Sequence, residues 1–311
     1  MRVIFMGTPD FAVGTLKALL ESGHEVAAVV TQPDKPKGRG KNMQFTPVKE
    51  VAVEAGITVL QPKKVREAQV VEELRTYAPD VIVVVAFGQL IPKEILEMPK
   101  YGCVNVHASL LPKYRGAAPI QWAVIDGEEK SGVTTMQMDE GLDTGDMLLK
   151  EEVVLDEEET GGSLFDKLSE VGAQLLLRTL DGLEKGTIVP EKQPEESTTA
   201  YAAMLTKHMG EIDWNKSAKE IERLIRGLNP WPSAFTRLGE KNVKIWRAAV
   251  LEEKTEHAAG DVIQIGKNRF GICTGNGILE ILELQPEGKK KMAADAFLRG
   301  YPLQDGMKAG K

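Results

Sequence analysis

Hydrophobic and polar positions in the first half of the chain follow two alternating patterns, short apolar runs and longer helical periodicities. Residues 2–6, apolar after Arg2, predict a strand, and a helical pattern led by Pro9 continues to about residue 22. Residues 81–85 read VIVVV, which is typical of a parallel strand buried on both faces. This alternation predicts a doubly wound α/β domain. Further strands are expected at residues 25–31, 57–60, 80–87, 103–107, 134–138 and 147–155, and further helices at 65–74, 120–125 and 163–184.

The last third of the chain has a different texture, with short strands at close spacing. Because such spacing is typical of small barrels, this region predicts a mostly β domain with a small β-barrel. The stretch before it is rich in Pro, Glu, Ser and Thr, which indicates a linker. The expected organisation is a first domain at 1–186, a linker at 187–205 and a second domain at 206–311. In the second domain a helix is expected at 217–228, strands at 243–250, 260–265, 269–274 and 277–284, and a hairpin turn at Asn276-Gly277.

Composition sets the broad class. The 311 residues are enough for two cores, since a single core rarely exceeds about 250 to 300 residues. The chain is 42% hydrophobic and 27% charged, which is ordinary for a soluble enzyme. Cys103 and Cys273 lie in no CxxC or Cys/His pattern, so no disulfide scaffold or structural zinc site is expected. Met1 and Arg2 lead directly into the first strand, and no apolar run reaches about 18 residues, so a cytoplasmic protein is expected.

Charge is unevenly distributed along the chain. The formal net charge is -7, but residues 206–311 hold 18 Lys and Arg against 14 Asp and Glu, a net charge of +4. Residues 33–49 also carry a net charge of +4, with Asp34 as their one acid. Prolines and glycines there predict a long, non-helical loop. Such a run is usually a solvated face, and it is also suited to contact a polyanion.

Two nucleotide-binding motifs are missing where a doubly wound domain would carry them. Residues 7–11, GTPDF, hold one glycine where a dinucleotide fingerprint needs three. Residues 38–42, GRGKN, lack the spacing and the Ser or Thr of a phosphate-binding loop. Nicotinamide, flavin and P-loop chemistry are therefore disfavoured.

A polar cluster is expected at the end of the strand that follows VIVVV. Asn105 and His107 lie two apart on that strand and so share one face, and sites of open α/β sheets gather at the carboxyl ends of such strands. The structural alternative is that both residues merely end a strand. A later glycine-rich loop supplies three acids, Asp139, Asp143 and Asp146, and spacing alone does not choose among them.

Two motifs carry a family resemblance. Residues 105–112 read NVHASLLP, followed by Tyr114-Arg115-Gly116, and residues 141–146 read GLDTGD. Together and in this order they resemble the formyltransferases that use 10-formyltetrahydrofolate. The resemblance implies that Asn105, His107 and Asp143 form the catalytic trio, with Asp143 lying 36 residues after His107.

Three further regions resemble the branch of this family whose acceptor is initiator methionyl-tRNA. They are residues 7–12 (GTPDFA), residues 31–41 (TQPDKPKGRGK) and the pair LQPEGK and FLRG near the C-terminus, with NPWP at 229–232 in the same set. The resemblance implies a Rossmann-like formyltransferase domain followed by a small OB-like β-barrel domain. It also implies formyl transfer from the folate to the methionyl α-amino group, without a metal. Nothing in the sequence requires an oligomer or a membrane, so a monomer is expected.

The resemblance also implies binding residues. The folate is expected along the loop after VIVVV and near the trio, although Leu90 and Ile91 could equally start a helix. The tRNA is expected at the basic loop, with Arg39 entering the acceptor stem, at Lys207 and on the +4 second domain. Trp214, Trp231 and Trp246 are expected to pack inside the barrel. The folate residues are Phe87, Gly88, Gln89, Leu90, Ile91, Ser109, Leu110, Leu111, Pro112, Asp139, Gly141 and Leu142, and the tRNA residues are Lys35, Lys37, Arg39, Lys41 and Lys207.

Three alternatives remain at this point. A formyltransferase acting on a small amine, such as a ribonucleotide or an amino-sugar nucleotide, would share the trio without needing the basic loop. A formyltetrahydrofolate hydrolase would share the folate pocket and pass the formyl group to water. A non-catalytic tRNA-binding protein would have basic patches and no reason for the trio.

Overall fold

The chain divides into two compact units. The computed structural model describes residues 1–37, 42–253, 255–304 and 306–310. Among these residues, no helix combines the length and the apolar character needed to cross a membrane. The predicted boundaries at residues 186 and 206 stay predictions, and two short segments before residue 186 group with the second unit. The first unit comprises Met1–Pro119, Lys130–Val154 and Phe165–Ala202, and the second comprises Ile120–Glu129, Leu155–Leu164 and Ala203–Lys311.

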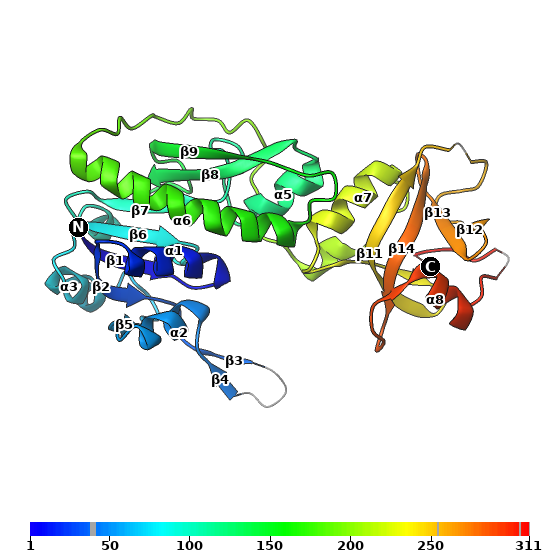
Figure 1. The fold of residues 1–311 in the computed structure, drawn as a ribbon, viewed down its shortest axis with the longest axis horizontal. Coiled ribbons are helices and arrows are strands. Elements are labelled where there is room, and N and C mark those ends of the chain that lie inside the picture. The colour runs from blue at the N-terminus through cyan, green and yellow to red at the C-terminus, as the bar shows by residue number, and fades with distance from the viewer. Residues whose placement is uncertain (38–41, 254, 305, 311) are drawn as a thin grey trace. The chain divides into compact units, whose positions relative to one another are not determined.

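A seven-stranded sheet lies at the centre of the first unit (Figure 1). In spatial order its strands are β5 (Val59–Leu60), β2 (Glu25–Val30), β1 (Arg2–Gly7), β6 (Val81–Val85), β7 (Cys103–His107), β8 (Lys130–Gln137) and β9 (Met147–Val154). The pairs from β5 to β7 are parallel, and β8 and β9 continue the sheet antiparallel. Strand order reverses between β1 and β6, so the carboxyl ends of β6 and β7 lie beside the switch point. The predicted doubly wound fold is confirmed.

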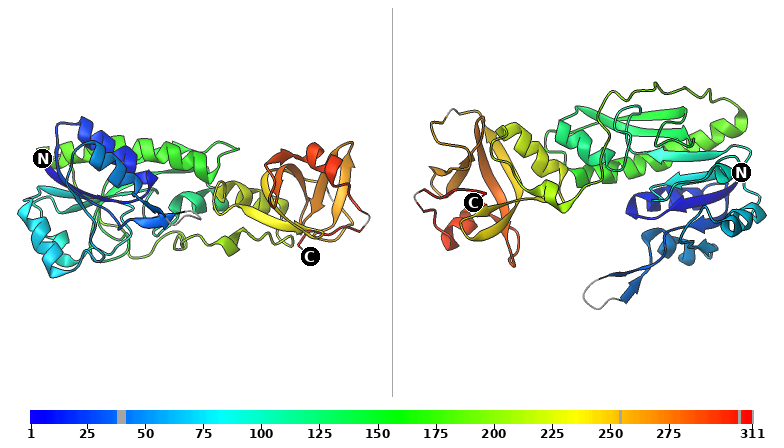
Figure 2. Two further views of the ribbon diagram at one scale, coloured as in Figure 1. Left: turned by 90° about the horizontal axis from the view of Figure 1, so that it is seen from below. Right: turned by 180° about the vertical axis from the view of Figure 1, so that it is seen from behind.

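Helices cover both faces of this sheet (Figure 2). They are α1 (Asp10–Glu21), α2 (Pro47–Glu54), α3 (Ala68–Thr76), α4 (Lys93–Leu96) and α6 (Gly161–Lys185). On one face, Phe11 of α1 meets Phe165 of α6 edge to face, with ring centroids 5.3 Å apart. On the other face, Val71 and Leu74 of α3 join a buried cluster with Ile82. Every residue of β6 is buried, as the all-apolar run predicts for a strand covered on both sides.

The described parts of the basic loop, residues 33–37 and 42–49, contain regular secondary structure. Strands β3 (Lys35–Lys37) and β4 (Asn42–Gln44) form an antiparallel pair, and α2 begins at Pro47. The Thr46 side chain caps this helix by accepting a hydrogen bond from the Lys49 amide at 3.1 Å. The prediction of a wholly non-helical segment through residue 49 is therefore wrong, because a Thr N-cap followed by Pro starts a helix.

The segment predicted as a linker is bonded to the first unit up to Ala202. Glu191 pairs with Met147 beside β9, and Ala202 pairs with Gly116 in a parallel bridge. Side chains between these bridges donate hydrogen bonds to residues of the first unit. A Pro-rich, polar sequence is compatible with this extended conformation, because its hydrogen bonds go to other parts of the chain.

The second unit is built on an open antiparallel sheet. The core of this unit is a buried cluster that includes Trp214, Ile221 and Phe270. Helix α7 begins after Ser217, whose side chain accepts from the Glu220 amide in a capping box. The elements are α5 (Pro119–Asp126), η1 (Lys207–Gly210), α7 (Ala218–Gly227), β10 (Ala234–Leu238), β11 (Lys241–Leu251), β12 (Val262–Gly266), β13 (Arg269–Cys273), β14 (Ile278–Pro286), β15 (Met292–Ala293) and α8 (Ala294–Gly300).

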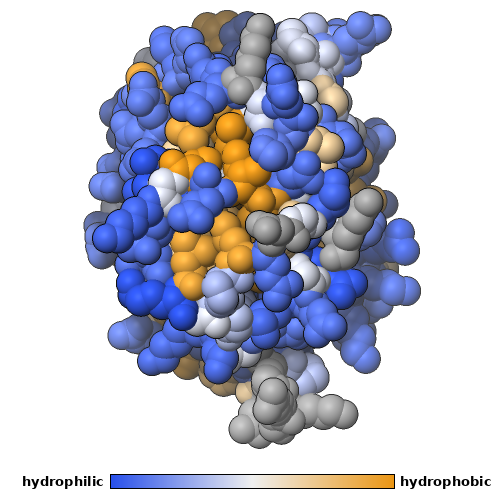
Figure 3. All heavy atoms as spheres, turned by 90° about the vertical axis from the view of Figure 1, so that its right-hand side faces the viewer, coloured by the Kyte–Doolittle hydropathy of each residue, from blue (hydrophilic) through white to orange (hydrophobic). Residues whose placement is uncertain are grey.

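A closed OB-like barrel is not confirmed. Strand order is β10-β11-β14-β13-β12, with β15 beside β14, and the edge strands β10 and β12 do not pair within the described residues. The C-terminal segment bridges these edges, since Ala309 pairs with Leu238 and Lys308 pairs with Asp261. Strand number and spacing alone do not encode such an edge contact. Figure 3 shows one face of this unit, where an apolar area is surrounded by hydrophilic side chains.

Candidate active site

The trio comes together at the carboxyl end of β7. Asn105 and His107 lie on this strand between β6 and β8, and both residues are buried, with 9% and 6% of their surface exposed. Asp143 comes from the loop between β8 and β9, and its Oδ1 lies 3.8 Å from Nδ1 of His107. Asp139 instead accepts hydrogen bonds from Gly141 and Thr144. Among the three acids, the described contacts therefore place Asp143 beside His107.

The backbone around His107 fixes its tautomer. Nε2 of His107 lies 3.0 Å from the carbonyl oxygen of Tyr114. Because a carbonyl oxygen only accepts, Nε2 carries a proton and donates it. In the neutral ring, Nδ1 is then a free acceptor that faces the Asp143 carboxylate. A proton captured at Nδ1 would lie directly beside this negative charge.

Asp143 is held in an uncommon conformation. Its φ of 57° lies in the left-handed region, which a non-glycine residue adopts only when its surroundings enforce it. Its Oδ2 accepts a hydrogen bond of 2.9 Å from the Gly116 amide. Two residues later, a Cβ on Gly145 would lie 1.8 Å from the Gln137 carbonyl oxygen, so glycine is required there. The loop therefore has little freedom to place Asp143 elsewhere.

The Asn105 amide is available to a ligand. Within the described residues every fully buried side-chain N or O atom has a partner, and no hydrogen bond of the Asn105 amide is found there. The amide must therefore reach the surface at the end of β7. A donor that is pre-positioned by a buried strand and left unpaired is suited to stabilise an oxyanion.

Only part of the expected folate set is open to a ligand among the described residues. The Phe87 and Ile91 side chains belong to the core under the sheet, and Leu111 packs with Met136 and Met147. The Gln89 side chain accepts a hydrogen bond from the Val65 amide and donates one to the Pro62 carbonyl. Leu90 and Leu142 are 71% and 56% exposed, and Gly88, Asp139 and Gly141 are exposed as well. All five lie on the loops where the folate is expected, and the buried residues offer backbone groups only.

The loop between His107 and Pro112 is tied to β8. The Thr134 hydroxyl donates to the Ser109 carbonyl at 2.7 Å and accepts from the Leu111 amide at 3.0 Å. The Ser109 hydroxyl donates to the Lys113 carbonyl, so it is already used within the loop. These bonds hold the backbone on either side of Leu110 and Pro112, whose own side chains are partly exposed.

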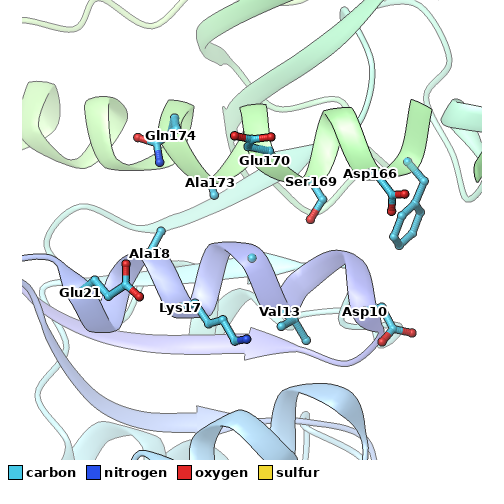
Figure 4. A pocket seen from close by; sticks show the side chains of 12 residues that line it. Asp10, Val13, Lys17, Ala18, Glu21, Asp166, Ser169, Glu170, Ala173 and Gln174 are labelled. Carbon is cyan, nitrogen blue, oxygen red and sulfur yellow. The ribbon is translucent and has the colours of Figure 1, made fainter. Parts of the chain in front are cut away.

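A separate groove lies between α1 and α6. Figure 4 shows side chains that line it, among them Lys17 and Glu21 on α1 and Glu170 and Gln174 on α6. Its volume is about 540 Å³, and its lining contains no member of the trio. The groove mixes carboxylates with an ammonium group and has no unpaired buried side chain among the described residues. Size alone therefore does not identify it as the reacting site.

The surroundings of the trio bear on thiolate and metal chemistry. Burial raises the pKa of the Cys103 thiol, two residues before Asn105, to about 12, so this thiol is not ionised at neutral pH. Within the described part of the chain, no group of three or more His, Cys, Asp or Glu side chains is arranged to hold a metal ion. Cys103 thus serves the core rather than as a thiolate nucleophile.

The structure describes three of the five expected tRNA residues. Lys35 and Lys37 lie on β3 and Lys207 lies in η1, whereas Arg39 and Lys41 lie outside the described residues. Lys49, which contributes to the charge of the basic loop, donates to Asp34 at 2.5 Å and to Gln61 at 2.7 Å. Hydrogen bonds from Lys49 and then Gln61 hold the pKa of Asp34 below its usual range. Lys49 is thus engaged within the protein.

In the second unit, a cationic patch surrounds Trp246. The Lys291 ammonium lies 3.6 Å from the ring centroid and the Lys244 ammonium lies 5.6 Å away. Trp214 and Trp246 are buried as predicted, but Trp231 is 54% exposed, so the prediction that it packs inside the unit is wrong. Trp231 lies in a turn outside the strands. The Asn229-Pro230 and Trp231-Pro232 peptide bonds on either side of it are both cis.

Sequence reasoning missed four groups that support the trio. They are the Tyr114 carbonyl, the Gly116 amide and the side chains of Arg115 and Gln193. The sequence did contain an indication that residues 114–116 are functional, because they extend the NVHASLLP motif. Gln193 had none, since it stands in a segment whose composition indicates a linker.

Comparison with known proteins adds independent evidence. The family model described as Formyl transferase matches residues 1–180, and the model described as Formyl transferase, C-terminal domain, matches residues 204–302. A methionyl-tRNA formyltransferase of Lachnospira eligens is 64% identical over 316 residues, covering 100% of both chains. One of Clostridioides difficile is 50% identical over 310 residues, again covering 100% of both. The solved N-formyltransferase from Helicobacter canadensis, in complex with folinic acid and dTDP-3-aminofucose, is similar in fold, with a TM-score of 0.66, 19% identity, and coverage of 93% of this chain and 99% of the other.

Proposed function

The chain belongs to the formyl transferase family, and from this premise we propose that it transfers the formyl group of 10-formyltetrahydrofolate to the methionyl α-amino group of initiator tRNA. The acceptor follows from relatives of 50–64% identity over the full length, all methionyl-tRNA formyltransferases. The observation that carries the chemistry is the meeting of Asn105, His107 and Asp143 at the end of β7. The enzyme thereby supplies formylmethionyl-tRNA for translation initiation.

The reaction places three demands on the site. The methionyl nitrogen must be neutral, and because an α-amino group titrates near about 8 and an ester lowers this value further, it is accessible at neutral pH. Its lone pair attacks the formyl carbon, whose carbonyl oxygen becomes an oxyanion. The carbon–N10 bond then breaks, a proton moves from the amine to N10, and the products are formylmethionyl-tRNA and tetrahydrofolate.

The geometry supports a role for each member of the trio. Asn105 donates its free amide to the oxyanion. His107 has its Nε2–H committed to Tyr114, so in the neutral form it accepts a proton at Nδ1 rather than serving as a second oxyanion donor. Asp143 stabilises the resulting imidazolium from 3.8 Å. His107 can then return the proton toward N10 of the leaving folate.

The direct test of this function is a product assay. The protein is incubated with 10-formyltetrahydrofolate and either methionyl-tRNA, an amino-sugar nucleotide, glycinamide ribonucleotide or buffer alone. Formylmethionyl-tRNA as the main product is the expected outcome. Free formate at the same rate in every tube would instead identify a hydrolase, and a formylated small amine would identify a different acceptor.

Leu142 is expected to form part of the folate wall. Truncation to Ala removes apolar surface that the bound pterin would cover, and about 1.4 kcal/mol of lost burial corresponds to a tenfold change. We expect Leu142→Ala to raise the KM for the folate about tenfold with a smaller effect on kcat. Val154→Ala, at another exposed apolar position of the first unit, is the matched control and should leave this KM unchanged. Equal effects of the two substitutions would remove Leu142 from the folate wall.

Lys35 is expected to contact a tRNA phosphate. It is exposed on β3, and each lost phosphate contact reduces the slope of log affinity against log salt by about 0.7 to 0.9. Lys35→Ala should therefore weaken methionyl-tRNA binding most at low salt and flatten the slope by nearly one unit. Lys185→Ala removes the same charge at the end of α6 and is the control. An unchanged slope for Lys35→Ala would exclude this contact.

A further inference from the structure

We propose that Arg115 and Gln193 act as positioning residues that hold the His107 and Asp143 sides of the site together. The inference deepens the proposed function, on which it rests. It assigns a positioning role to residues 193–199, called the brace below, which lie in the stretch whose composition indicates a linker. Four observations carry it: a buried cation, an amide bonded at both ends, two left-handed residues and the hydrogen bonds of the brace to both sides of the site.

Arg115 is a buried guanidinium with neutral partners. It is 7% exposed, and within the described residues no carboxylate lies within ion-pair distance of it. Its Nε and Nη2 donate to Oε1 of Gln193 at 3.0 and 2.9 Å, and its remaining bonds go to the Glu195 and Pro194 carbonyls. Burying a cation without an anion is costly, so its retention indicates a need for the geometry that it imposes.

Gln193 transmits this geometry to the Asp143 loop. Its Nε2 donates to the Asp143 carbonyl at 2.9 Å and to the Gly145 carbonyl at 2.7 Å. The positive charge on its oxygen side polarises the amide and strengthens these two donations. Because one end must accept from a cation and the other must donate to two carbonyls, a side-chain amide satisfies all four bonds where a carboxylate cannot.

The same segment braces the His107 side. The Ser197 hydroxyl donates to the Pro112 carbonyl at 2.6 Å, and the Thr199 hydroxyl accepts from the Tyr114 amide at 2.7 Å. The Tyr114 carbonyl in turn receives the Nε2–H of His107. Residues 193–199 thus bind the backbone that orients the imidazole as well as the backbone that carries the carboxylate.

Both anchored residues adopt backbone conformations that need support. Tyr114 and Asp143 have φ values of 56° and 57°. A non-glycine residue keeps such a conformation only where neighbouring groups determine it. Thr199 bonds one of these residues and Gln193 bonds the other, so loss of the brace would release the alignment of His107 with Asp143.

Gln193→Glu is the sharpest test of this brace. The substitution keeps the size of the side chain and its pairing with Arg115, and it replaces the donor facing the Asp143 and Gly145 carbonyls by an acceptor. We expect kcat for formylmethionyl-tRNA to fall about 10- to 100-fold, with the KM for both substrates within about threefold. Gln174→Glu makes the same chemical change at an exposed position of α6 and should be silent.

A double-mutant cycle separates positioning from general structure. If Gln193 acts through Asp143, Gln193→Glu should cost less than about threefold in an Asp143→Asn background. An equal cost in both backgrounds, or a Gln193→Glu kcat within twofold of wild type, would overturn the proposal. Thr199→Val provides a second reading if Gln193→Glu does not fold, and a kcat unchanged from wild type in that variant would overturn it as well.

Hydrogen exchange makes the test independent of the acceptor. The Gly116 amide donates to the Asp143 carboxylate, so its exchange should accelerate in Gln193→Glu while that of the sheet amides stays unchanged. If wild type forms no formylmethionyl-tRNA, the proposed function fails. The exchange rate of the Gly116 amide still tests whether Gln193 positions the Asp143 loop. Unchanged exchange at Gly116 in folded Gln193→Glu would reject it.

Discussion

Asn105→Ala is expected to transfer the formyl group about 100- to 1000-fold more slowly than wild type in a single turnover. The Asn105 amide has no hydrogen-bond partner among the described residues, so its removal leaves no internal group unsatisfied. Strand β7 is buried at every position and paired on both sides, which holds the amide in place before substrate arrives. The lost hydrogen bond would stabilise the oxyanion of the transition state rather than the bound substrates, so its loss raises the barrier of the chemical step.

The expected signature of this substitution is a change in rate without a change in binding. Single-turnover mixing with saturating folate and methionyl-tRNA isolates the chemical step, and the KM of each substrate should stay within a few-fold of wild type. Asn242→Ala, at an exposed position of β11, is the control. If folded Asn105→Ala kept more than a third of the wild-type rate, another group would have to supply the oxyanion donor.

Much of the first unit could be predicted because burial dictates its pattern. The all-apolar run of β6 required cover on both faces, and the next strand then had to deliver Asn105 and His107 to the carboxyl edge. Local composition also located the helix from Ser217, where the capping box lies within four residues. These features are determined by residues that lie close together in the sequence, so the sequence alone predicts them.

What could not be predicted depends on contacts between distant segments. The hydrogen bonds from Gln193 to Asp143 and Gly145 span 50 and 48 residues, and nothing in a Pro- and Glu-rich stretch distinguishes a brace from a solvated linker. The open edges of the second sheet are a similar case. The spacing of its strands indicated a barrel, whereas the two edges do not pair with each other in the described structure and are instead bridged by the segment around Ala309.

The choice of acid shows the same division. Sequence spacing left Asp139, Asp143 and Asp146 open, and the family resemblance selected Asp143. In the structure, Asp139 is held within its own loop by Thr144 and Gly141, whereas Asp143 turns toward His107 from a left-handed backbone position. The backbone conformation that distinguishes them comes from bonds to Gln193 and Gly116, which lie far away in sequence.

Asp143→Asn is expected to lower the single-turnover rate by about 100- to 10,000-fold, the range typical of a lost acid–base group. The Asn oxygen can keep the bond from the Gly116 amide, so the loop need not move. The amide nitrogen would then face Nδ1 of His107 and donate to it. This would hold the imidazole neutral with both nitrogens occupied, and the proton shed by the methionyl amine would have no acceptor.

The neighbouring acid Asp146 provides a matched control for this result. Asp146→Asn makes the same chemical change in the same loop and should lower the rate by less than about fivefold, because no described contact of Asp146 involves His107. In His107→Ala, the further change Asp143→Asn should have almost no effect, since the carboxylate acts through the ring. A larger loss from Asp146→Asn than from Asp143→Asn, or full additivity with His107→Ala, would show that the proton takes another route.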